Sequence, residues 1–404
     1  MYQALSVAAG TTVLLPNVHD LKWLPEDNMI FPYISLFLGP KILKMHLSVK
    51  NCELVGLSLL PTLCSRFPSL RDFHLHLVED TRAMAEASSV AVCGWSQLRE
   101  LDVGGLTHSA LMHVGRLPYL TRLSCRLIDG SMPAAFTSSL DSSWFPVLRS
   151  IVIQSIDLTS CSFLVEALSS AHLSNFSLSC SGSSSSSGWR HLFDAMRNHC
   201  NHSTLTSADL WDMDESVLGH NTDILTVGSI RPLFVFFNLW SVSLCPRQGI
   251  DIDDTDMKEL AKAWPQLSSL SMTTRSTTDR KPRVTLAGLI PLAKYCRQLS
   301  TVSINVNACD VSMSQSRPAG GIVSATFDCL GIGDSPITDP MPVAAFLSDI
   351  FPGITSIYTF NGDCVDENSK WDKVVQFIPT FVCMRLQERN HEAQDETSDD
   401  EVDS

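Results

Sequence analysis

The chain has 404 residues, 44% of them apolar, and a net charge of −14, so it holds enough apolar material for a large core. Residues 390–404 contain seven acids and no Lys or Arg, which leaves a charge of −7 on the rest of the chain. This mild acidity argues against nucleic-acid binding, because a nucleic-acid-binding protein needs a basic stripe that displaces counterions from phosphates.

We expect no signal peptide in the N-terminal segment, since it lacks the positively charged start of one. Nowhere does an apolar run reach the roughly 18 residues that span a bilayer. The thirteen cysteines are odd in number and scattered through apolar segments. That distribution is typical of reduced thiols, so we expect a cytoplasmic or nuclear protein without membrane contact.

One phrase recurs along the chain: an apolar residue, two variable positions, a second apolar residue, one variable position and a third apolar residue. Clear copies begin at Leu70, Leu98, Leu120, Leu148, Leu173, Leu267 and Leu299. Weaker copies begin at Val18, Ile42, Leu205, Leu239, Phe327 and Ile354. The thirteen copies are on average 28 residues apart. This period is typical of leucine-rich repeats.

The alternation inside each phrase predicts a short strand with one buried face. Between the phrases, helical periodicity predicts helices over 54–67, 107–117, 161–172, 256–264 and 285–296. Thr107 is a candidate N-cap, and Asp256 with Glu259 has the spacing of a capping box. One strand and one helix cannot close a core alone. We therefore predict an α/β leucine-rich-repeat solenoid, with a curved parallel sheet on the concave face and helices on the convex face.

The solenoid is expected to occupy residues 1–370, with two interruptions. The Ser-rich run at 181–188 predicts a flexible loop between the seventh and eighth strands, and an irregular insertion is expected at about 212–232. A helix over 371–389 would cap the last repeat, despite Pro379. The acidic segment 390–404 is expected to be a disordered tail.

The segment 14–47 resembles the F-box and leucine-rich-repeat proteins of mushroom-forming fungi. The matching residues are Pro16, Leu21, Trp23, Phe31, Pro32, Tyr33, Leu36, Phe37, Leu38 and Pro40. The resemblance implies substrate recognition for an SCF-type ubiquitin ligase, whose subunits are possible partners. The F-box itself is missing from the pattern, so we expect it to be truncated or lost. The alternative is a stand-alone leucine-rich-repeat scaffold or inhibitor with no ligase link.

The variable strand positions of such a solenoid point to the concave face, which is the usual surface for a protein target. Its N-terminal half is expected to be charged and rich in His, and its C-terminal half is expected to be rich in hydroxyl groups. Arg122 and Arg126 would also suit a phosphate. The alternative for each position is an ordinary solvated strand residue. Our candidate target-binding residues are His74, His76, Asp102, Arg122, Arg126, Asp209, Trp211 and Tyr358.

No motif predicts catalysis, a metal or a cofactor, so we expect a protein that is not an enzyme. The His199–His202 cluster lacks the spacing of a zinc site. The run 251–256 lacks the Gly and Glu of a calcium loop and fits an acidic turn before a helix better. In the tail, Ser398 lies in a segment typical of substrates for acid-directed kinases, although a solubilising tail explains these residues equally well.

Overall fold

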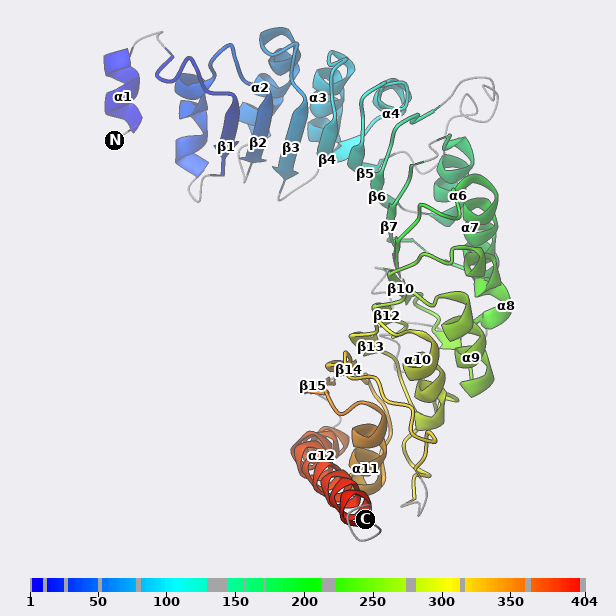
Figure 1. The fold of residues 1–404 in the computed structure, drawn as a ribbon. Helices are drawn as coiled ribbons and strands as arrows, with labels where there is room; N and C mark the ends of the chain where they lie inside the picture. Colours follow the sequence, from blue (N-terminus) through cyan, green and yellow to red (C-terminus); the bar gives the residue numbers. More distant parts are fainter. Residues whose placement is uncertain are drawn as a thin grey trace. The chain divides into compact units, whose positions relative to one another are not determined.

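The computed structural model describes residues 2–9, 13–24, 28–49, 53–77, 81–128, 144–155, 157–169, 172–182, 184–212, 223–273, 281–312, 317–359 and 365–399. The chain divides into two compact units. The first unit comprises Met1–Leu205 with Asp212–Glu215, and the second comprises Thr206–Trp211 with Ser216–Ser404. Within each unit, parallel strands form one layer and helices form the other (Figure 1).

In the first unit, the described strands pair in chain order, and every pair is parallel. They are β1 (Asp20–Trp23), β2 (Lys44–Val49), β3 (Asp72–Leu77), β4 (Glu100–Leu106), β5 (Arg122–Leu127), β6 (Ser150–Ser155) and β7 (Asn175–Cys180). The helical elements are α1 (Tyr2–Ala9), η1 (Asn28–Phe37), α2 (Glu53–Arg66), α3 (Arg82–Cys93), α4 (His108–Val114), α6 (Leu158–Ala167) and α7 (Ser186–His199).

In the second unit, the main strands also pair in chain order and in parallel. They are β8 (Ser207–Asp212), β10 (Ser241–Cys245), β12 (Ser269–Ser271), β13 (Thr301–Ser303), β14 (Cys329–Gly331) and β15 (Ser356–Tyr358). A small separate sheet pairs β9 (Leu225–Thr226) with β11 (Ile250–Asp251). The helical elements are α8 (Val227–Ile230), η2 (Arg231–Val235), α9 (Asp254–Ala263), η3 (Leu286–Leu289), α10 (Ile290–Tyr295), α11 (Pro340–Ile350) and α12 (Val365–Asp399).

The predicted repeat architecture is confirmed. Each of the thirteen phrases leads into a strand that begins two residues after the first apolar residue of the phrase. In the third repeat, for example, Leu70, Phe73 and Leu75 are buried, whereas His74 between them is half-buried and His76 is exposed. The apolar positions therefore face the helices, and the variable positions lie on the uncovered face of the sheet.

Tryptophans hold neighbouring repeats together in both units. Trp95 is fully buried and donates a hydrogen bond from Nε1 to the Phe67 carbonyl oxygen of the preceding repeat at 3.0 Å. In the second unit, buried Trp264 donates in the same way to the Leu233 carbonyl oxygen at 3.2 Å. Each indole therefore fills the core of one repeat and satisfies a buried carbonyl of another.

Of the two helix starts that we predicted from capping residues, one is confirmed and one is shifted. Thr107 is the N-cap of α4, as predicted, and its hydroxyl accepts a hydrogen bond from the Ala110 amide. The capping box of α9, however, lies three residues earlier than predicted, with Asp253 at the N-cap and Asp256 at the third helical position. Asp at N3 accepts the reciprocal hydrogen bond that the predicted box assigned to Glu259.

The Ser-rich run 181–188 differs from the flexible loop that we predicted. Ser184 is buried, Ser185 is the N-cap of α7, and the helix begins at Ser186. Ser is among the strongest N-cap residues, because its hydroxyl accepts a hydrogen bond from an unpaired amide of the first turn. Composition alone does not separate a Ser cap from a Ser linker. The described part of the second interruption, 223–232, forms β9, α8 and the start of η2.

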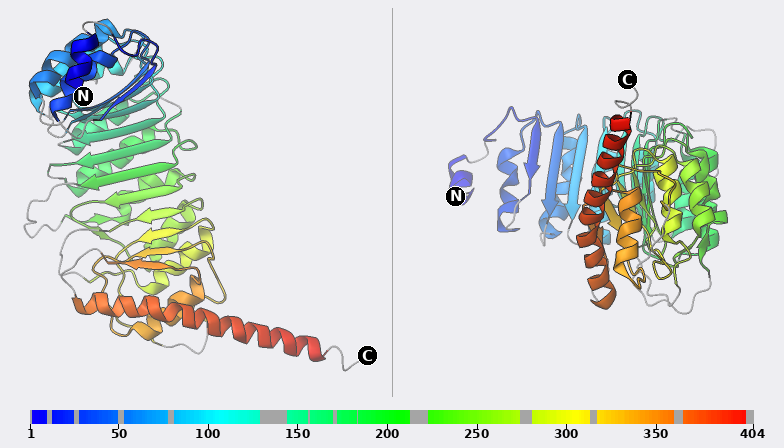
Figure 2. Two further views of the ribbon diagram at one scale, coloured as in Figure 1. Left: turned by 90° about the vertical axis from the view of Figure 1, so that its left-hand side faces the viewer. Right: turned by 60° about the horizontal axis from the view of Figure 1, so that its bottom comes forward.

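The capping helix is longer than predicted in both directions. α12 begins at Val365 and continues to Asp399, ten residues into the segment that we expected to be disordered (Figure 2). Trp371, Val374 and Ile378 are buried on one side of α12, which packs against α11. A helix already anchored in this way extends without a new nucleation step, and residues 392–394 (Glu-Ala-Gln) have favourable helix propensities.

Candidate functional site

The uncovered sheet face of the first unit arranges its side chains in rows that run across the strands. The parallel register aligns Lys44, Asp72, Glu100 and Arg122 in one row, followed by Ser150 and Asn175. The next row contains His46, His74, Asp102, Ser124, Val152 and Ser177. Residues from neighbouring repeats, far apart in sequence, are therefore cross-strand neighbours on strands about 4.8 Å apart.

Alternating charges pair along the first row. Lys44 Nζ lies 2.7 Å from Asp72 Oδ2, and the Asp72 side chain is 9% exposed. The hydrogen bond and charge of Asp72 raise the pKa of Lys44. At the other end, Arg122 Nη1 lies 3.4 Å from Glu100 Oε1. The four charged residues of this row therefore form two neutral pairs on this face.

A histidine pair dominates the second row. The rings of His46 and His74 stack with centroids 4.2 Å apart and an interplanar angle of 4°. His74 also lies 3.6 Å from Asp102 Oδ2 and 3.8 Å from Glu100 Oε2. Desolvation, followed by the charge of His74, lowers the pKa of His46. The hydrogen bond with His74 is the largest cause that lowers the pKa of Asp102.

The structure thus brings together three of the candidate residues, His74, Asp102 and Arg122. His76 is exposed in the third row, and Arg126 is half-buried four residues beyond Arg122. Four residues along a strand span about 13 Å, and Arg122 is already paired with Glu100. The structure thus shows Arg122 paired with an acid, and joint binding of one phosphate by the two arginines stays a prediction.

The corresponding face of the second unit carries mainly hydroxyl groups. Ser241, Ser269 and Thr301 share one row, and Ser243, Ser271 and Ser303 share the next. Asp209 and Trp211 on β8 are half-buried, and the Trp211 indole donates a hydrogen bond to the Asp209 carboxylate. Tyr358 on β15 is 54% exposed.

Sequence reasoning missed two exposed aromatics of the second unit. Trp240 and Phe237 are 53% and 50% exposed and lie where the chain enters β10. Trp240 occupies the second position of its repeat phrase, which is polar in most other repeats. An aromatic residue at that position was the signal that could have revealed it.

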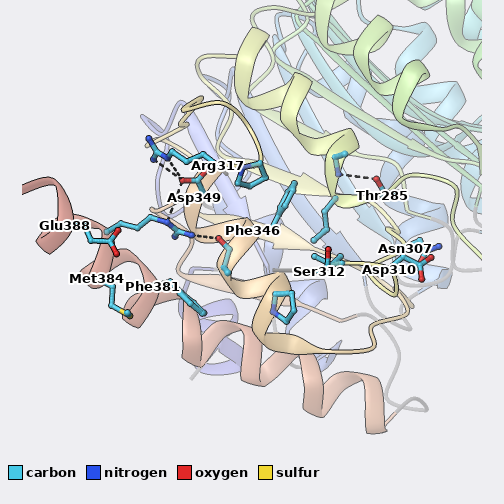
Figure 3. A pocket seen from close by; sticks show the side chains of 17 residues that line it. Thr285, Asn307, Asp310, Ser312, Arg317, Phe346, Asp349, Phe381, Met384 and Glu388 are labelled. Carbon is cyan, nitrogen blue, oxygen red and sulfur yellow. Dashed lines mark hydrogen bonds and ion pairs between the residues drawn. The ribbon is translucent and has the colours of Figure 1, made fainter. Parts of the chain in front are cut away.

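A pocket of about 680 Å³ lies in the second unit between α11, α12 and residues 307–318. Figure 3 shows Asp349 at one end of the pocket beside Arg317, with Phe346 and Phe381 along its walls. Asp349 is 2% exposed, and its Oδ1 lies 2.9 Å from Arg317 Nη2 and 3.6 Å from Arg385 Nε. Because Arg385 belongs to α12, this buried cluster fastens the terminal helix to α11.

Several side chains that could act as nucleophiles or metal ligands are buried or cap a helix. Burial raises the pKa of the thiols of Cys125, Cys161, Cys200 and Cys296 to about 12, so they are protonated at neutral pH. The acidic run 251–256 caps α9, as expected. In the described part of the chain, His, Cys, Asp and Glu form no group of three that could hold a metal ion.

Ser398 lies within α12, and its side chain is outside the described residues. No helix in the described ranges combines the length and apolar character that crossing a membrane requires.

Comparison with known proteins adds little. No family model and no curated protein sequence matches this chain. Among solved structures, a chain in the crystal structure of the Rad7 and Elc1 complex in yeast is similar, with 14% sequence identity and a TM-score of 0.47. The match covers 89% of this chain and 82% of that chain. The class of the protein, an α/β repeat protein, therefore follows from its own strand order.

Proposed function

We propose that this chain is a protein-binding module that holds a protein target against the uncovered faces of its parallel strands and catalyses no reaction itself. One observation carries the proposal: in the first unit, the cross-strand network of Lys44, His46, Asp72, His74, Glu100, Asp102 and Arg122 lies on the sheet face opposite the helices. Fixed, paired charges of this kind give electrostatic selectivity to an interface.

The more specific role that we propose is substrate recognition for an SCF-type ubiquitin ligase. It rests on the resemblance of segment 14–47 to F-box and leucine-rich-repeat proteins. Within the described residues, Trp23, Phe31 and Leu36 of that segment are buried, and the ring centroids of Phe37 and Trp23 are 5.3 Å apart. These residues therefore belong to the core of the first unit. A stand-alone scaffold or inhibitor is the second candidate, and it requires only the binding face.

The test is capture of a target from native cells by the full chain, followed by identification of the captured proteins by mass spectrometry. The face variant His46→Ala/His74→Ala/Asp102→Ala should lose a protein that wild type retains. A matched control, Arg82→Ala/Glu86→Ala/Arg190→Ala, changes exposed residues on the helices α3 and α7 and should retain it. Equal capture by both variants would contradict the proposal.

The same capture separates the two candidate functions. The ligase role predicts that the protein produced from its native gene, which would restore a truncated F-box, retrieves the linker subunit of the ligase. The face substitutions should leave this retrieval unchanged, because the linker and the target bind different surfaces. A target that is captured repeatedly without the linker subunit favours the stand-alone scaffold or inhibitor.

A further inference from the structure

One edge of the first unit, where the chain enters the strands, carries a row of arginines. Arg71, Arg99 and Arg149 directly precede β3, β4 and β6, and all three are exposed. Their backbones form a ladder in which the Arg99 amide donates to the Arg71 carbonyl at 2.6 Å, the Thr121 amide to Arg99 at 2.8 Å, and the Arg149 amide to Thr121 at 2.8 Å. At about 4.8 Å per strand, Arg149 lies about 10 Å beyond Arg99.

In the repeat between those of Arg99 and Arg149, the residue directly before the strand is Thr121 and not an arginine. This repeat supplies an arginine from the turn that precedes Thr121. Arg116 is exposed, and its guanidinium lies 5.1 Å from the centre of the Trp144 ring. The turns themselves are adjacent, since the Phe145 amide donates to the Gly115 carbonyl at 2.7 Å. Four consecutive repeats therefore each bring one arginine to the same edge.

These four arginines have no acidic partner within 4.0 Å among the described residues. The nearest acids in the register, Asp72 and Glu100, are engaged by Lys44 and Arg122. The sequence also lacks acids in the segments that lead into the strands. No Asp or Glu occurs in residues 39–43, 67–71, 94–99, 115–121, 144–149, 168–174 and 200–206. In the sequence, by contrast, Glu79, Asp80, Asp129 and Asp157 follow the last residue of a strand by two or three positions.

We propose that this arginine edge, Arg71, Arg99, Arg116 and Arg149, binds an extended Asp- and Glu-rich segment of the protein target. The inference rests on the proposed function and deepens it. Three of the arginines are spread along the ladder and Arg116 lies in the adjacent turn, whereas a single phosphate would need converging cations. An extended peptide places alternate carboxylates about 6.6 Å apart, which matches a row of cations spaced between about 4.8 and 10 Å. Arginine pairs with such carboxylates in a bidentate geometry.

A nucleic acid fits this edge less well than an acidic peptide. The chain carries a net charge of −14, which repels a long polyanion. Sequence-independent binding of nucleic acid typically uses about 6–10 phosphate contacts, and the edge offers four arginines. A short acidic peptide carries fewer charges than a long polyanion, so it meets less of this repulsion.

The experiment uses the full-length chain and fluorescein-labelled octaglutamate, with binding measured by fluorescence anisotropy at low and moderate salt. We expect Arg71→Ala/Arg99→Ala/Arg149→Ala to bind the probe about tenfold more weakly than wild type, since three exposed ion pairs are lost. The matched control, Arg82→Ala/Arg190→Ala/Arg197→Ala, removes the same charge from exposed helix positions and should bind like wild type. Circular dichroism melts confirm that both variants fold.

Three results would overturn the inference. They are equal binding by the edge variant and the control, tighter binding of a twelve-nucleotide DNA strand than of octaglutamate, and binding of octaglutamine as tight as that of octaglutamate. Its failure is distinguishable from failure of the proposed function. If the edge variant still captures the native target that the face variant loses, the edge inference is wrong and the binding function stands.

Discussion

The two units share one repeat plan but present different sheet faces. The strands β2–β7 of the first unit are six or seven residues long, whereas β12–β15 of the second unit have three residues each. A six-residue strand exposes three side chains on one face, and a three-residue strand exposes two. The first unit also pairs opposite charges across its strands, while the second aligns hydroxyl groups.

This difference shows that one repeat phrase can support either a selective or a permissive surface. Opposite charges fixed by register accept some partners and repel others, because a like charge placed against them is costly. Hydroxyl groups both donate and accept hydrogen bonds, so they discriminate less. The face of the first unit therefore supports target selection more strongly, and three predictions test the contrast between the units.

The largest expected effect comes from the buried tryptophans that link repeats. Trp95→Ala in the first unit and Trp264→Ala in the second should each lower the free energy of unfolding by about 3–5 kcal/mol, because each leaves a cavity and an unpaired carbonyl. Hydrogen exchange should show loss of protection in the mutated unit. Loss of protection in both units in either variant would contradict the division into two units. Trp95→Phe, which keeps most of the volume, should cost less.

A smaller loss is expected from the buried carboxylate of the second unit. Asp349→Ala should lower the free energy of unfolding by about 3 kcal/mol, since it leaves Arg317 and Arg385 without their shared partner. Exchange protection of α12 should fall first. The control Glu259→Ala breaks an exposed pair with Arg231 and should cost no more than about 1 kcal/mol. Equal effects of the two substitutions would show that the cluster does not fasten α12.

The smallest effect is a difference in pH dependence between the units. Ten of the twelve histidines lie in the first unit. Because the pKa of His46 is lowered in the folded protein, the unfolded chain binds a proton at His46 more readily than the folded protein does. The contribution of His46 to the free energy of unfolding is therefore present above pH 6.5 and is lost as the pH falls below 6.5. The pKa of Asp102 is also lowered, but the stability that Asp102 contributes is lost only below about pH 4. Between pH 7.5 and 5.5, His46→Asn should flatten the decline in hydrogen-exchange protection of the first unit. An unchanged slope would rule His46 out as its source.

The local parts of the fold could be predicted from residues close in sequence. The repeat phrase located the thirteen strands that pair in chain order, because six consecutive residues contain the burial alternation of a strand. It did not locate β9 and β11, which form the small separate sheet. Thr107 was predicted as a cap for the same reason, since a cap bonds an amide three residues away. The identity of the face positions, including His74, Asp102 and Arg122, followed from the same phase.

Pairing between repeats could not be predicted, because it depends on register and on loops of unequal length. The His46–His74 stack joins residues 28 positions apart, and Asp349 meets Arg317 and Arg385, which are 32 positions before it and 36 after it. The arginine edge was hidden for the same reason: Arg71, Arg99 and Arg149 are isolated in sequence and align only when the strands stack. The sequence by itself determined the repeat and the side of the sheet on which each residue lies. The tertiary structure decided which residues meet, because contacts across strands are set by stacking and not by periodicity.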